Sequence, residues 1–302
     1  MDHAELLQST NLRFHFTADS LLNLPPYKGS VFHGAFGLAL KRVAPPLYNA
    51  LFDPASIESN GDVPKPFVLR PPSAAECHYS ADSTLQCELI LIGHAINHLS
   101  ACICAMDSLG RTGIGKERGK LSLARVDVLK PGYAPSTIYS AHDQRWHPPP
   151  PAVTGAEIIA ATTGIAPTTV TLDFQSHIRL QADNRLVYTP PPFHLFFSRV
   201  LGRLSMLARF HHGFDLLDNN SKQVLLEKAK QIETGANSLR WDDWTRYSGR
   251  QKTLMKFGGL LGEISYKGEL EPFMPYLALG EWLHVGGKTS FGLGKYVIRV
   301  KR

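Results

Sequence analysis

Two ionisable side chains between Ser30 and Val43 have the spacing that would place them on one face of a helix. His33 and Lys41 would lie about 12 Å apart along the helix axis. Tyr27 and Lys28 come directly before this segment. A histidine exchanges protons near neutral pH, and a lysine stabilises charge on a phosphate. The group therefore predicts proton transfer at an RNA phosphate, although a solvated helix face has the same pattern.

The segment from His284 to Tyr296 combines many glycines with two lysines. Its glycines are Gly286, Gly287, Gly292 and Gly294, and its lysines are Lys288 and Lys295. Glycine allows close approach to backbone N–H groups, so the segment predicts a contact with phosphates. The Gly-Lys-Thr tripeptide is not a P-loop, because Trp282 stands where the first glycine is needed and a strand follows. A purely structural glycine turn is the alternative.

Two other segments are basic. Residues 111–130 hold six Lys or Arg residues, including Lys116, against two acids. The glycines at 113–119 do not form a dinucleotide fingerprint, because the third glycine is one residue late. Residues 239–256 carry Arg246, Arg250 and Lys252 with tryptophan and tyrosine between them. Cations interleaved with aromatic rings suit RNA, and a solvated surface over core tryptophans is the alternative.

The composition excludes several classes of protein. The chain has 302 residues, 43% of them hydrophobic, which is typical of globular proteins and not of disordered ones. The formal net charge of +6 favours an anionic partner. The acidic start shows no signal peptide, so we expect a cytoplasmic protein without a membrane partner. Four cysteines without zinc spacing, and the pair His94 and His98 without a third ligand, predict no metal site.

The hydrophobic pattern predicts the same order of elements, βαββαβ, in both halves of the chain. The first set is strand 12–16, helix 30–43, strands 67–69 and 85–92, helix 94–109 and strand 121–129. The second set is strand 169–180, helix 192–212, an inserted helix 221–234, a hairpin of 255–261 with 263–266, helix 272–283 and strand 295–301.

This order predicts an α+β protein with tandem ferredoxin-like domains. The first domain would span residues 1–130 and the second residues 168–302, with the inserted helix and the glycine-rich segment in the second. Residues 131–167 contain a run of prolines, which continues neither a helix nor a central strand, so we expect a linker there.

Five segments in order resemble one family. They are Leu24–Arg42, Leu109–Leu123, Trp241–Gln251, Gly258–Ile264 and Gly280–Tyr296. Together they are similar to the CRISPR-associated RAMP endoribonucleases of the Cas-six family, which cut precursor CRISPR RNA. The resemblance implies tandem ferredoxin-like domains and cleavage of CRISPR repeat RNA without a metal or other cofactor. The substrate 2′-OH would attack the adjacent phosphate and leave a 2′,3′-cyclic phosphate and a 5′-OH.

The resemblance also implies roles for the residues named above. The family's catalytic histidine often lies on or just after the first helix, which assigns His33 as general acid or base. Lys41 would stabilise the phosphate and Tyr27 would orient the reacting groups. If His33 does not transfer the proton, Tyr27, Lys41 or His284 remain. The expected RNA-binding residues are Gly286, Gly287, Lys288, Gly292, Gly294, Arg246, Arg250, Lys252, Lys28 and Lys116.

Two other functions compete with this one. A non-catalytic RAMP subunit would share the fold and hold CRISPR RNA in a complex with other Cas effector subunits. A metabolic enzyme would use the glycine-rich segments for a nucleotide, but both nucleotide fingerprints fail on spacing. The paired domains and the histidine on the first helix favour the endoribonuclease.

Overall fold

Alternating residues of β1 (Gln8–Ala18) build the core of the first domain. Leu12, Phe14 and Phe16 are at most 1% exposed, whereas the residues between them are partly exposed. The buried face of the sheet is covered by α1 (Gly29–Val43) and α3 (Leu99–Thr112). The computed structural model describes residues 3–54, 63–72, 76–160, 162, 164–248 and 253–300. None of the helices within these residues combines the length and apolarity that a membrane span requires.

The first sheet has the strand order of a ferredoxin-like domain. The antiparallel order β3-β5-β1-β6 joins β3 (Phe67–Arg70), β5 (Thr84–Ile92), β1 and β6 (Leu121–Leu129). Smaller elements surround it: η1 (Ala4–Leu6), β2 (Leu22–Asn23), α2 (Pro45–Phe52), β4 (His78–Tyr79) and η2 (Gly93–His98). The apolar run of β5 is buried on both faces, with Leu89 in the core of this domain and Ile90 in the core shared with the second.

The segment 131–167 does more than link the domains. It forms β7 (Ser136–Ser140), β8 (Arg145–Trp146), β9 (Val153–Thr154) and α4 (Gly155–Ala160). β7 pairs with β6, β8 pairs with β7, and β9 pairs with the start of β1. The expectation of a plain linker is therefore corrected: the prolines separate short edge strands that widen the first sheet, where a missing N–H disrupts no central ladder.

The second domain repeats the architecture. Its elements are β10 (Thr169–Ile178), α5 (Phe193–His211), β13 (Glu233–Asn237), β14 (Arg240–Asp242), β17 (Gly259–Lys267), α7 (Met274–Leu283) and β18 (Tyr296–Val300). The sheet order β13-β17-β10-β18 matches that of the first domain. The remaining elements are β11 (Gln181–Ala182), β12 (Arg185–Leu186), α6 (Asn219–Ala229), β15 (Thr245–Ser248), β16 (Thr253–Lys256), η3 (Glu271–Phe273) and η4 (Thr289–Phe291). The prediction of tandem ferredoxin-like domains is confirmed.

Two local predictions in this domain were wrong. The helix predicted for 221–234 ends at Ala229, and a strand begins at Glu233. The turn predicted between 255–261 and 263–266 is absent: β17 runs through it as one strand, and residues 255–256 belong to β16. The glycines of β17 allow close approach: a Cβ at Gly259 or Gly262 would lie 2.7 Å from a carbonyl oxygen of the neighbouring backbone. The hairpin lies earlier, between β15 and β16.

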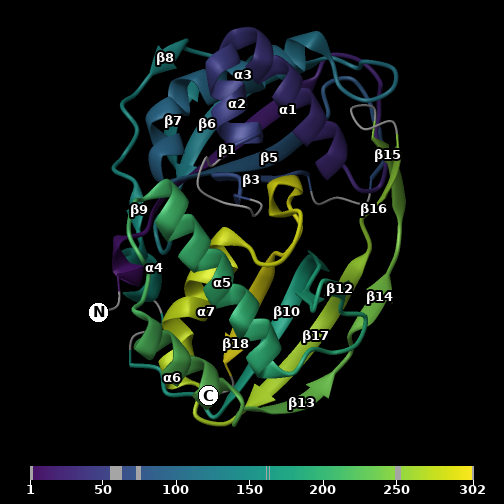
Figure 1. The fold of residues 1–302 in the computed structure, drawn as a ribbon. Helices are drawn as coiled ribbons and strands as arrows, with labels where there is room; N and C mark the ends of the chain where they lie inside the picture. Colours follow the sequence, from purple (N-terminus) through teal and green to yellow (C-terminus); the bar gives the residue numbers. More distant parts are fainter. Residues whose placement is uncertain are drawn as a thin grey trace.

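The two domains share a continuous interface. Ile90, Ile92 and Val68 of the first sheet belong to the same buried cluster as the helix α5. The glycine-rich segment 284–295, which we call the glycine loop, extends from the second domain to β3 and α1 (yellow in Figure 1). A Cβ at Gly292 would lie 2.7 Å from the Leu69 carbonyl oxygen. The glycine loop thus fixes the position of one domain against the other.

Candidate active site

The glycine loop meets the first turn of α1 at two residues. The Tyr27 hydroxyl donates a hydrogen bond to the backbone carbonyl of Phe291. Gly29 lies beside the same carbonyl, and a Cβ there would overlap both the Phe291 oxygen and the Tyr27 hydroxyl. Only glycine therefore fits at the first position of α1, and the contact places His33, one turn further on, against the loop.

The imidazole of His33 lies against the side chain of Phe291. The two rings are stacked with centroids 3.7 Å apart and an interplanar angle of 17°. Phe52 and Phe67, at 5.0 and 5.9 Å, contact the imidazole from the first domain. The side chain is half-buried. An aromatic surrounding on several sides holds the imidazole in one orientation, as a group that transfers a proton to a bound substrate requires.

Lys288 lies in the same cluster of aromatic rings. Its Nζ is 3.6 Å from the centroid of Phe257, a cation–π contact. Phe257 in turn packs on Phe291 at 5.2 Å and on Trp244 at 4.8 Å. Trp244 is 4.5 Å from Tyr27, which closes the cluster on α1. A histidine and a lysine thus meet one aromatic cluster at the junction of the domains.

Tyr27 and Lys28 are both removed from solvent. Burial raises the pKa of Tyr27, so its hydroxyl stays protonated and acts as a donor to the loop. Lys28 is 0% exposed, its Nζ donates to the Pro26 carbonyl at 3.3 Å, and burial lowers its pKa. Neither residue presents a charge to RNA in this structure. Tyr27 contacts the loop through its hydroxyl, and its orienting role stays a prediction, as does RNA binding by the buried Lys28.

The other predicted residues are dispersed. Lys41 is exposed at the far end of α1, with its Nζ 5.7 Å from the Tyr48 ring, and the structure does not bring it to His33. Lys116 is exposed in the turn between α3 and β6. Arg246 belongs to β15, whose side chains are outside the described part of the structure. Arg250 and Lys252 lie outside the described residues.

The glycines of the loop use their N–H groups within the protein. The N–H of Gly287 donates to the Arg179 carbonyl at 2.8 Å, that of Gly292 to Thr289 at 2.8 Å and that of Gly294 to His177 at 3.0 Å. These three N–H groups are therefore already paired within the protein, and RNA binding by the loop glycines stays a prediction. Gly286 has φ +90°, and a Cβ there would lie 2.5 Å from the Arg179 oxygen. The glycines shape the loop, and RNA contact through Lys288 stays a prediction.

A polar network beneath the loop escaped the sequence analysis. Arg70 at the end of β3 donates from Nε to His284 Nε2 at 2.7 Å and from Nη1 to Glu88 at 2.9 Å. His284 Nδ1 donates to the Leu293 carbonyl at 2.9 Å, so the ring is the neutral Nδ1–H tautomer. Burial, and then Arg70, lower the pKa of His284 well below its ordinary value. His284 is buried and joins the loop to Arg70 of β3 through these hydrogen bonds.

Replacing Gly29 by alanine is expected to displace the glycine loop from α1. The added Cβ overlaps the Phe291 carbonyl, so either the loop or the first turn of α1 must move. We expect the rate of RNA cleavage to fall at least tenfold, since misplacing a catalytic group by about 1 Å costs up to a hundredfold. Gly202→Ala in α5 is the matched control, because no atom lies within 4 Å of its Cβ. Equal rates for the two variants would contradict the loop's role.

The described residues contain no group of three or more histidine, cysteine or acidic side chains that could hold a metal ion. The groups that the site offers are an imidazole, an ammonium group and a phenol. Such groups can move protons and stabilise phosphate charge.

Two family models match the sequence. The model described as CRISPR-associated endoribonuclease Cas6 matches residues 167–296, and AF_1859_N, described as an N-terminal domain, matches residues 7–151. No curated protein matches the sequence significantly.

Solved structures of similar fold cover nearly the whole chain. A Cas6 (TTHB231) product complex is 20% identical with a TM-score of 0.63, over 96% of this chain and 100% of that chain. Thermus thermophilus Cas6 (TTHB231) is 18% identical with a TM-score of 0.60, over 97% and 99%. The Cas6 (TTHA0078) product complex is 19% identical with a TM-score of 0.55, over 98% and 100%. The Cas6 family model thus matches the second domain, and the whole chain has the fold of the solved Cas6 structures.

Proposed function

We propose that the protein cleaves CRISPR repeat RNA to mature CRISPR RNA, without a metal ion, at the junction of α1 and the glycine loop. The observation that supports this most is the stacking of His33 on Phe291, 3.7 Å between centroids. It holds an imidazole from the first domain beside a lysine-bearing loop of the second. The similar Cas6 structures that contain product support RNA as the substrate.

In the proposed reaction the RNA supplies its own nucleophile. The 2′-oxygen attacks the adjacent phosphorus, the bond from phosphorus to the 5′-oxygen breaks, and a 2′,3′-cyclic phosphate and a 5′-OH form. His33 takes the proton from the 2′-OH or gives one to the leaving 5′-oxygen, a contribution of roughly 10²–10⁴-fold. The Lys288 ammonium stabilises the negative charge on the phosphate oxygens. Tyr27 acts through its hydrogen bond to the loop.

The proposal is tested with labelled RNA that carries the CRISPR repeat of the genome encoding this chain. We expect one cut in the repeat in the presence of excess EDTA. The 5′ fragment should resist phosphatase until acid opens its cyclic phosphate, and the 3′ fragment should accept phosphate from polynucleotide kinase. Cleavage that needs Mg²⁺, or fragments with a 5′-phosphate, would contradict the mechanism. Tight binding without cleavage would favour the non-catalytic RNA-holding subunit.

A further inference from the structure

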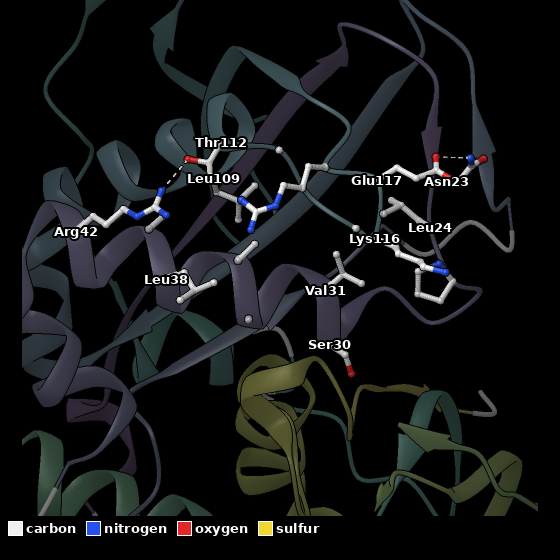
Figure 2. A pocket seen from close by; sticks show the side chains of 17 residues that line it. Asn23, Leu24, Ser30, Val31, Leu38, Arg42, Leu109, Thr112, Lys116 and Glu117 are labelled. Atoms are coloured by element: carbon white, nitrogen blue, oxygen red, sulfur yellow. Dashed lines mark hydrogen bonds between the residues drawn. The ribbon is translucent and has the colours of Figure 1, made fainter. Parts of the chain in front are cut away.

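A groove of about 620 Å³ runs along α1, between that helix and the turn at residues 113–119 (Figure 2). Part of its lining is aliphatic: Leu24, Val31, Leu38 and Leu109. Its cations are Arg42, Lys116 and Arg118, and Glu117 is the acid among its lining residues. The groove is therefore an apolar channel with a positive rim, and it takes no part in the site described above.

Two hydrogen bonds join the walls of the groove, and neither of them involves Lys116 or Arg118. Arg42 donates to Thr112 at 3.3 Å, and Asn23 donates to Glu117 at 2.7 Å, as Figure 2 shows. Lys116 and Arg118 are exposed, and within the described part of the chain no side chain pairs with them. Arg118 also has φ +54°, a left-handed conformation that a non-glycine residue adopts at some cost. The turn thus holds two free positive charges at the rim.

One end of the groove lies at the first turn of α1, the turn that contacts the glycine loop. Ser30 lines it, directly after the glycine that contacts the Phe291 carbonyl. Figure 2 shows the Ser30 hydroxyl directed from α1 toward the glycine loop. This side chain is 5% exposed, and its Oγ has no hydrogen-bond partner among the described residues. From Ser30 to Arg42 the helix rises about 18 Å, enough for more than one nucleotide.

We infer that this groove binds the single-stranded RNA next to the scissile phosphate, an inference that rests on the proposed function. Lys116 and Arg118 contact backbone phosphates, while Val31 and Leu38 pack on ribose and base. The groove would thereby orient the strand on one side of the cut, which aligns the 2′-oxygen with the bond that breaks.

The test measures RNA affinity against salt concentration. The probe is repeat RNA with flanking nucleotides on both sides and a 2′-deoxy group at the mapped scissile nucleotide, so that it cannot be cut. The variant is Lys116→Ala with Arg118→Gly, because glycine relieves the left-handed backbone. Each lost phosphate contact should reduce the slope of log affinity against log salt by about 0.7, so we expect a reduction of about 1.4. A second RNA ends at the cut and lacks the nucleotides on the side that the groove binds. Wild type and variant should bind this shortened RNA with the same slope.

Lys228→Ala with Lys230→Ala is the matched control, since it removes two exposed positive charges at α6. An unchanged slope in the groove variant, or an equal change in the control, would overturn the inference. So would a difference that persists on RNA shortened on either side. If wild type cuts the RNA but the groove variant has the same salt slope as wild type, only the assignment of the groove is wrong. If wild type neither binds nor cuts the RNA, the proposed function fails, and this inference falls with it.

Discussion

His33→Phe is expected to lower the single-turnover rate of RNA cleavage by about 10²–10⁴-fold, with RNA affinity within about threefold of wild type. Phenylalanine keeps a flat ring against Phe291, where the rings are now 3.7 Å apart, but it has no nitrogen to carry a proton. The substitution therefore separates proton transfer from packing. The rate is measured with enzyme in excess over labelled repeat RNA, so that product release does not limit it.

His142→Ala is the control, because that histidine is exposed in the turn between β7 and β8. We expect its rate to equal that of wild type. If His33→Phe cleaves as fast as wild type, His33 only packs against the loop, and proton transfer must come from another group. If His33→Phe instead loses both RNA affinity and stability, the imidazole makes a structural contact with Phe291 that a phenyl ring does not replace.

Much of the fold could be predicted because its elements have strong local patterns. The period of two in β1 and the continuous apolar run of β5 define strands without reference to any partner. β13 and β14 escaped prediction because their residues are largely exposed, so no alternation marks a buried face. The prolines of residues 131–167 concealed edge strands, whose pairing depends on the sheet beside them.

For the site, the sequence indicated the chemistry of single residues but not the contacts between them. The types of His33, Tyr27 and Lys288 suggested their chemistry, and all three meet one aromatic cluster. The use of the glycine N–H groups depends on Arg179 and His177, which are distant in the sequence. The pair Arg70 and His284 is separated by more than half of the chain, and no local signal connects them. Contacts between domains are tertiary, so spacing along the sequence does not reveal them.

Arg70→Met is expected to lower the free energy of unfolding by about 3 kcal/mol, since it removes one partner of a largely buried ion pair. The side chains of Arg70 and Glu88 are only 14% and 16% exposed. The guanidinium also donates to His284 Nε2 and, at 3.0 Å, to the Trp282 carbonyl, so the substitution leaves acceptors of both domains without their donor. The free energy is measured by urea denaturation at pH 7.

Arg111→Met is the matched control, because Arg111 pairs with Asp107 on the surface, where its side chain is 73% exposed. Such a pair contributes about 0.5 kcal/mol, and equal losses in the two variants would contradict the prediction.

The pH dependence of stability gives a second test of the same ion pair. Burial opposes ionisation of Glu88, but Arg70 and Arg13 outweigh it and lower the pKa from 4.5 to about 2. Its stabilisation is therefore complete above pH 4.5 and is lost as the pH falls toward 2. Arg70→Met brings the pKa of Glu88 nearer its ordinary value, so the variant should lose less stability between pH 5 and 3 than wild type does.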